Sequence, residues 1–134
     1  MSISSKEVGQ FGEKIAEKYL KKKGYQILDK NYEEGLVSGP SRGEIDIISR
    51  KDGTVIFVEV KTLLKNHRPE AFSAISPEDK VDFTKQRKLI KTAQSWLVKN
   101  RTPLNSKWQI DVIAIRVDLN SEKAKIRHFK NAVC

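Results

Sequence analysis

Residues 43–61, GEIDIISRKDGTVIFVEVK, decide the fold. Two runs rich in Ile and Val flank Asp52-Gly53, a dipeptide typical of the two-residue turn of a β-hairpin. The same runs carry four ionisable residues at positions where hydrophobic side chains would suit a buried sheet better: Glu44, Asp46, Glu59 and Lys61. The hairpin therefore predicts a central part of the sheet and, within it, a polar site.

A two-residue turn fixes which residues of the hairpin face one another. It pairs Lys51 with Thr54, so the numbers of cross-strand partners add up to 105 and Asp46 lies opposite Glu59. Opposed residues share a face of the sheet, as do residues two apart, so all four ionisable groups should project to one side. The other side should be lined by Ile45, Ile47, Val58 and Val60. A three-residue turn would instead send the two acids to opposite faces.

The opposition of Asp46 and Glu59 needs compensation. Two like charges about 5 Å apart repel by about 3 kcal/mol at an effective dielectric constant of about 20. A shared proton would relieve this repulsion by raising the pKa of one acid, and a bound divalent cation would relieve it more directly. Mg²⁺ takes one or two protein carboxylates and completes its shell with water and phosphate oxygens. The acid pair therefore predicts a metal site suited to phosphodiester hydrolysis.

Lys61 has two interpretations. Beside a metal site its ammonium group would stabilise negative charge that develops on the phosphate, or it would help to orient the attacking water. Alternatively, it forms an ordinary cross-strand ion pair with Glu44, its partner in the predicted register, and has no catalytic role.

The composition of the whole chain limits the class of protein. A length of 134 residues favours one domain, residues 1–134. The 26 Lys and Arg against 17 Asp and Glu give a net charge of +9, which favours a polyanionic partner, although solubility alone would also account for it. The single cysteine excludes an intramolecular disulfide, and no apolar run approaches the length of about 20 residues that a membrane helix needs. We expect a soluble, cytoplasmic protein that does not bind membranes.

Hydrophobic periodicity predicts the remaining elements. A helix with one apolar face should end before Gly24, and Ser76-Pro77 carries the signals of a second helix start. The second helix should bury Phe83, Ile90, Ala93, Trp96 and Leu97. The predicted elements, in chain order, are a helix over residues 5–23, a strand over 25–32, the two strands of the hairpin, a helix over 76–100, a strand over 109–119 and a weak final strand over 125–129.

Several polar residues outside the hairpin are candidates for function. Five basic residues are predicted phosphate contacts, each with a solvated surface charge as the alternative: Arg42, Arg50, Lys85, Arg87 and Lys88. Asp111 begins a mostly buried strand, where it caps, pairs with a basic group or supports the site. His128 lacks metal-ligand spacing, so we expect it at the surface.

The chain resembles the PD-(D/E)xK nuclease superfamily, whose signature is an acid on one strand, a turn, and then acid-x-Lys on the next strand. Asp46, Glu59 and Lys61 match this signature. Over about residues 8–117 the chain is similar to the small bacterial YraN-like family, a relative of the archaeal Holliday-junction resolvases. The matching stretches include Gly43-Glu44-Ile45-Asp46, Phe57-Val58-Glu59-Val60-Lys61, Gly24-Tyr25 and Asp111-Val112-Ile113.

The resemblance implies an α/β fold with a restriction-endonuclease-like core, in which a mixed β-sheet is flanked by helices. It also implies a Mg²⁺- or Mn²⁺-dependent endonuclease that cuts DNA rather than RNA, with branched or junction DNA among its substrates. Asp46 and Glu59 would bind the metal and Lys61 would assist. Glu13 matches a helix glutamate that adds to the metal site of resolvase-like relatives, although a solvated glutamate is an equal alternative. The same relatives imply a homodimer.

Two other functions remain open. One is a non-catalytic nucleic-acid-binding protein that retains the nuclease fold, because a fold alone does not establish activity. The other is a dimeric scaffold whose acids hold a structural cation. The intact set of Asp46, Glu59 and Lys61 favours the nuclease, because a pure binder gains nothing from acids that face a phosphate backbone.

Overall fold

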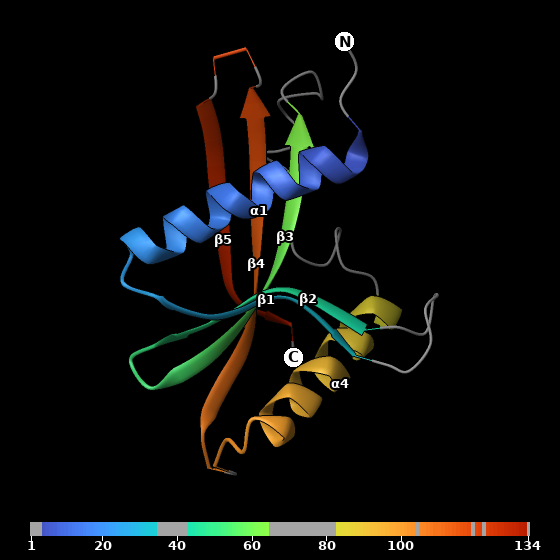
Figure 1. Ribbon diagram of the computed structural model, residues 1–134, viewed down its shortest axis with the longest axis vertical. Coiled ribbons are helices and arrows are strands. Elements are labelled where there is room, and N and C mark those ends of the chain that lie inside the picture. The colour runs from blue at the N-terminus through green and yellow to red at the C-terminus, as the bar shows by residue number, and fades with distance from the viewer. Residues whose placement is uncertain are drawn as a thin grey trace.

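A mixed β-sheet flanked by two helices forms the described part of the chain. The computed structural model describes residues 4–34, 43–64, 83–103, 105–118, 120–121 and 123–133. The elements are α1 (Ser5–Lys22), β1 (Gln26–Glu34), β2 (Gly43–Lys51), β3 (Thr54–Leu64), α4 (Phe83–Lys99), β4 (Lys107–Asp118) and β5 (Lys123–Val133). Figure 1 shows α1 lying across β3, β4 and β5, and α4 beside the other end of the sheet. This order confirms the predicted α/β fold.

The five strands follow one another in the order β1-β2-β3-β4-β5. Neighbours are antiparallel except β3 and β4, which are parallel, and α4 lies in the connection between these two strands. A parallel pair requires such a long crossover connection. The hairpin has the predicted register, since all described partners of β2 and β3 add up to 105, from Lys51 with Thr54 to Ile47 with Val58. The two-residue turn at Asp52-Gly53 is therefore confirmed.

Helix α1 begins and ends at clear local signals. The Ser4 hydroxyl accepts a hydrogen bond from the Glu7 N–H, and the Glu7 side chain accepts one from the Ser4 N–H, which is a capping box. The chain leaves the helix at Gly24, whose φ of +92° favours glycine. The buried face of α1 contains Gly12, Ala16 and Leu20.

Two apolar clusters fill the space between the sheet and its helices. One lies under α1 and includes Leu20, Ile47 and Val58, and the other lies under α4 and includes Phe57 and Trp96. Two side-chain predictions are wrong. Ile45 packs in the α4-side cluster with Ile48 rather than with Ile47, so β2 does not alternate regularly around Asp46. Phe83 is 73% exposed, and Leu89 instead contributes to the core.

The side chain of His128 is buried rather than at the surface, which corrects the expectation from its spacing. Its side chain is 6% exposed, and its Nε2 lies 2.7 Å from Asp111 Oδ2. The Tyr19 hydroxyl is hydrogen-bonded to His128 Nδ1 at 2.9 Å, while Asp111 Oδ1 accepts from Gln109 and from the Asn131 N–H. Asp111 therefore pairs with a basic group, and this network joins α1, β4 and β5.

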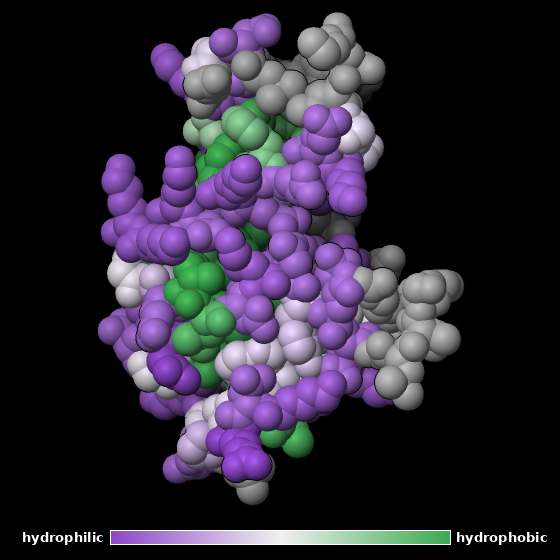
Figure 2. Space-filling view, in the orientation of Figure 1, coloured by the Kyte–Doolittle hydropathy of each residue, from purple (hydrophilic) through white to green (hydrophobic). Residues whose placement is uncertain are grey.

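The surface on the α1 side is mainly hydrophilic. Figure 2 shows hydrophilic side chains gathered over α1, with apolar patches exposed below the helix. Among the elements that the structure describes, no helix has the length and apolar character needed to span a membrane.

Candidate functional site

Asp46 lies where β2 and β3 separate. The regular pairing of the hairpin ends at Ile47 with Val58, while β3 continues beside β4 as far as Leu64. Beyond this point the Val60 N–H donates a hydrogen bond of 2.8 Å to Asp46 Oδ2. The carboxylate thus replaces the backbone carbonyl that a continuous ladder would supply. This bond fixes Asp46 at the mouth of the separated strands.

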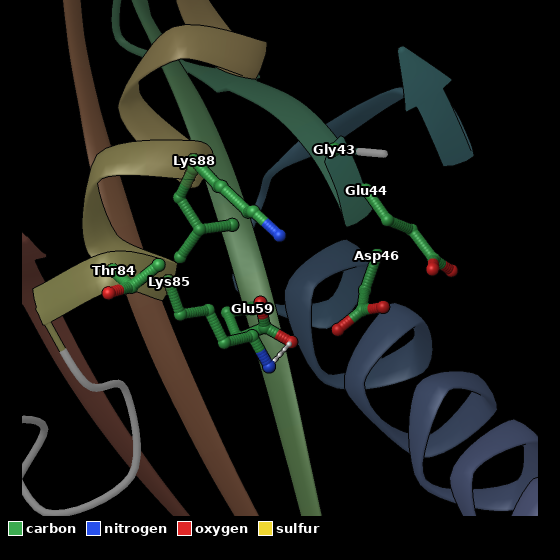
Figure 3. A pocket seen from close by; sticks show the side chains of 8 residues that line it. Gly43, Glu44, Asp46, Glu59, Thr84, Lys85 and Lys88 are labelled. Carbon is green, nitrogen blue, oxygen red and sulfur yellow. Dashed lines mark ion pairs between the residues drawn. The ribbon is translucent and has the colours of Figure 1, made fainter. Parts of the chain in front are cut away.

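A cavity of about 370 Å³ opens at this mouth. It is lined by Gly43, Glu44, Asp46, Glu59, Thr84, Lys85, Lys88 and Leu89. Figure 3 shows the carboxylates of Asp46 and Glu59 directed into the same space, with Lys85 reaching Glu59 from α4. We call this cavity the acidic pocket. The prediction that acids from both arms of the hairpin converge is therefore confirmed for Asp46 and Glu59. Glu44 lines the rim of the pocket, but its carboxylate is directed away from the other two.

The close approach of α4 to β2 brings lysines to these acids. A Cβ atom added at Gly43 would lie 3.2 Å from the Cβ atom of Thr92 and would press on the Thr92 hydroxyl, so the glycine favours the close approach of the helix to the start of β2. Leu89 and Ala93 anchor the same side of α4 in the core. Lys85, one turn before Leu89, then projects over β3.

Glu59 is largely, though not fully, buried in the pocket. Its side chain is 12% exposed, and the Lys85 Nζ atom lies 3.5 Å from Glu59 Oε1. Burial, followed by the charge of Asp46, raises the pKa of Glu59 to about 8, and the attraction of Lys85 opposes this rise only in part. A pKa raised in this way favours the protonated form of Glu59 at neutral pH, which would relieve its repulsion with Asp46.

Glu13 approaches Asp46 from the α1 side. The two residues line a second cavity, of about 300 Å³. Burial, and then the charges of Asp46 and Glu44, raise the pKa of Glu13 to about 7. Asp46 lines both cavities, so it lies between Glu13 on one side and Glu59 on the other. Within the described ranges, however, no three His, Cys, Asp or Glu side chains form a group arranged to hold a metal ion.

The other predicted site residues divide into two groups. Lys85 and Lys88 line the acidic pocket. Lys61, two residues beyond Glu59 on β3, is exposed and is not among the residues that line the pocket. Arg50 is exposed on β2 near the turn, and Arg87 is exposed on α4 over the Phe83 ring. Arg42 lies outside the described residues.

The contact between Lys85 and Glu59 could not be predicted from the sequence, because it depends on how α4 packs. One signal was present in the sequence: Lys85 and Lys88 are three residues apart, so both fall on one face of the helix, adjacent to Leu89.

Comparison with known proteins shows relatives over nearly the whole chain. A UPF0102 protein from Clostridium beijerinckii is 40% identical over 132 residues, with 98% of this chain and 97% of the relative covered. UPF0102 protein TTE1452 from Caldanaerobacter subterraneus is 38% identical over 133 residues, with 97% of each chain covered.

Among solved structures, an fdxN element excision controlling factor protein from Anabaena variabilis gives a TM-score of 0.40 at 16% identity, with 90% of this chain and 98% of that chain covered. A TM-score of this size does not establish a shared fold.

The model of the family described as "Uncharacterised protein family UPF0102" matches residues 12–115. This match agrees with the predicted similarity to the YraN-like family. The chain therefore belongs to the UPF0102 family.

Proposed function

We propose that the chain is a divalent-cation-dependent nuclease that hydrolyses phosphodiester bonds in DNA. The observation that carries the proposal is the acidic pocket, in which Asp46 and Glu59 face the same space and lysines of α4 line the opposite wall. Paired acids next to cations suit a phosphate that must be held beside a metal ion. The match of Asp46, Glu59 and Lys61 to the signature of PD-(D/E)xK nucleases supports the same function.

The residues present fit Mg²⁺ or Mn²⁺. Both cations accept carboxylate oxygens, and Mg²⁺ needs only one or two of them because it keeps several waters and takes phosphate oxygens of the substrate. Asp46 and Glu59 would hold the cation. Glu13 would approach it from α1, because Glu13 and Asp46 together line the second cavity. A bound cation would polarise the phosphate and favour ionisation of a water molecule.

The residues of the chain would share the remaining tasks. Lys85 and Lys88 line the pocket, so their ammonium groups would attract the scissile phosphate and stabilise the negative charge that grows on its oxygens. The bond from Val60 to Asp46 would hold one carboxylate in a fixed orientation. Lys61, exposed on β3, would contact a phosphate next to the scissile one. In the overall reaction water adds to phosphorus and the bond to one sugar oxygen breaks.

A cleavage assay tests the proposal. The protein is incubated with supercoiled plasmid, linear duplex and a four-way junction, each with Mg²⁺, Mn²⁺, Ca²⁺ or EDTA. We expect cleavage with Mg²⁺ or Mn²⁺ and none with EDTA. Asp46→Asn and Glu59→Gln should each lower the rate at least about 100-fold. Asp52→Asn makes the same charge change at the far end of the hairpin and should leave the rate unchanged.

Two results would contradict the nuclease. Cleavage that persists in Asp46→Asn and Glu59→Gln would mean that the site lies elsewhere. Binding of all three DNA substrates without cleavage under any cation would favour the non-catalytic nucleic-acid-binding protein instead.

A further inference from the structure

The sheet face on the α4 side continues past the acidic pocket along β3, β4 and β5. Residues paired across strands share a face. Glu59 pairs with Val112, and Val112 pairs with Phe129. Val112 lies in the core under α4, and Phe129 packs against the same cluster. This row therefore marks both the edge of the pocket and the side of the sheet to which it belongs.

Beyond this row the α4 side of the sheet is mainly basic. The next row contains Lys61, Ala114 and Arg127, the row after it contains Leu63, Arg116 and Lys125, and a last pair joins Asp118 to Lys123. We call Lys61, Arg116, Lys123, Lys125 and Arg127 the basic strip. Residues on one face of a strand repeat about every 6.7 Å, so the strip extends about 20 Å from the Glu59 row, and three strands give it a width of about 10 Å.

The strip is accessible in the described part of the chain. Lys61, Lys123 and Lys125 are exposed, and Arg116 and Arg127 are half-buried. Helix α1 covers the opposite face, and α4 packs mainly on β2 and β1. Neither described helix therefore covers these rows.

The charge of the strip is mostly uncompensated. Within the described ranges Lys61, Arg116, Lys123 and Lys125 form no ion pair. Asp118 is the one acid of these described rows, and its oxygens accept hydrogen bonds from the Asn120 N–H and the Ser121 hydroxyl. Three cations, Arg116, Lys123 and Lys125, line a hollow of about 310 Å³ together with the single acid Asp118. The strip thus presents clustered cations to a polyanion.

We propose that the basic strip is the surface along which double-stranded DNA lies when one of its phosphates enters the acidic pocket. The inference rests on the proposed function, since it takes DNA as the substrate. A length of about 20 Å corresponds to about six base pairs at 3.4 Å per pair, long enough for several phosphate contacts. Proteins that bind single strands use exposed aromatic rings as stacking platforms. In the described rows the one aromatic side chain is Phe129, and the Arg127 guanidinium lies over its ring at 4.8 Å.

Anisotropy of a fluorescent DNA duplex of about 20 base pairs, titrated with protein in EDTA at about 50 to 200 mM salt, tests the strip. The variant Arg116→Gln with Lys125→Gln loses two cations of the strip. Each phosphate contact contributes about 0.9 to the slope of log K against log salt, so we expect the slope to shrink by about 2 and the affinity to fall about 50-fold at about 0.1 M salt.

The matched control is Lys18→Gln with Lys22→Gln, which removes the same charge from the exposed side of α1. It should change the affinity less than about 3-fold, because these lysines make no phosphate contact. Equal losses of DNA affinity in the two double variants would contradict the proposal that DNA lies along the strip, since net charge alone would then explain binding. An unchanged slope of log K against log salt in the variant Arg116→Gln with Lys125→Gln would contradict the same proposal. A greater loss with single-stranded DNA or duplex RNA than with duplex DNA would overturn the assignment to duplex DNA.

Folding of the strip variant and cleavage of the DNA are each checked separately from binding. If circular dichroism shows that the loss of half-buried Arg116 disturbs folding, Lys123→Gln with Lys125→Gln replaces that variant, because both lysines are exposed. Since EDTA prevents metal-dependent cleavage, binding is measured separately from activity. Cleavage without strip-dependent binding would contradict only the proposal that DNA lies along the strip. Strip-dependent binding without cleavage would contradict only the proposal that the protein is a nuclease.

Discussion

Two acids of the acidic pocket, Asp46 and Glu59, lie where their repulsion lowers the stability of the metal-free protein. Asp46 interrupts the alternation of β2 and accepts the Val60 N–H, while Glu59 is buried against it with a pKa of about 8. Titratable groups whose pKa is strongly shifted by burial and a specific partner are typical of functional sites. A divalent cation between Asp46 and Glu59 would convert their repulsion into attraction, which is why we propose a functional role for the pair.

We expect Glu59→Gln to stabilise the metal-free protein increasingly as pH rises. The pKa of Glu59 rises from 4.5 to about 8 on folding. A carboxyl group of this kind contributes stability below its unfolded pKa, and the contribution is lost as pH rises through the folded pKa. The free energy of unfolding of the wild type should therefore fall relative to that of Glu59→Gln between about pH 4.5 and 8. Urea denaturation in EDTA measures this difference.

Glu17→Gln provides a control of opposite sign. Hydrogen bonds from Lys21 and Lys30 lower the pKa of Glu17, so its stabilising contribution is present above its unfolded pKa and is lost as pH falls. This variant should be slightly less stable than the wild type at neutral pH. A difference between wild type and Glu59→Gln that does not change with pH would show that Glu59 does not have the raised pKa.

Asp111→Ala should destabilise the protein by about 3 kcal/mol, because it leaves the buried His128 and the Asn131 N–H without their acceptor. Thermal or urea denaturation measures the loss. Lys91→Ala, an exposed substitution on α4, should stay within about 0.5 kcal/mol of the wild type. A loss below about 1 kcal/mol for Asp111→Ala would mean that the network does not hold β4, β5 and α1 together.

Among the helices and strands, features that depend on local sequence signals were predicted correctly, and features that depend on tertiary contacts were not. The end of α1 before Gly24 and the Asp52-Gly53 turn depend on local signals, and both features lie where the sequence predicted them. Strand β5 runs over Lys123–Val133 rather than over the short predicted range, because β4 pairs along most of it. The side of α4 that carries Phe83 was mispredicted, since a hydrophobic side chain near a helix end need not face the core.

Gly12→Ala tests the packing of α1 on β3. A Cβ atom at Gly12 would lie 2.8 Å from the Cβ atom of Thr62, so one of the two elements must shift. We expect a loss of about 1 to 3 kcal/mol in the free energy of unfolding. Gly9→Ala is the matched control on the same helix: nothing lies within 4 Å of the added atom, so the variant should gain about 0.5 to 1 kcal/mol. Equal effects of the two substitutions would contradict the close approach.

Over the whole molecule, the sequence predicted the sheet, the convergence of the acids and the family, but it did not predict how the cations are arranged. The turn sets the register of the hairpin as far as Ile47 with Val58, which can be counted from the sequence, and Asp46 and Glu59 follow directly beyond this pair. The contact of Lys85 with Glu59 requires the packing of α4, and the rows of the basic strip require the pairing of β3, β4 and β5. These contacts join residues far apart in the chain, so no local pattern reports them.

Divalent cations should stabilise the whole protein through the acidic pocket. A ligand that binds only the folded state adds about 2.7 kcal/mol at 100 times its dissociation constant. We expect Mg²⁺ or Mn²⁺ to raise the melting temperature of the wild type and to leave that of Asp46→Asn unchanged. Asp52→Asn should respond as the wild type does, since the turn lies at the far end of the hairpin. An equal rise in all three proteins would indicate binding elsewhere.

Anomalous diffraction from crystals soaked in Mn²⁺ would locate the cation itself. We expect one Mn²⁺ peak within the acidic pocket, between the carboxylates of Asp46 and Glu59, and no peak there in Asp46→Asn crystals soaked in the same way. A wild-type pocket that stays free of Mn²⁺, or a peak confined to another part of the surface, would contradict the assignment of these acids as a metal site.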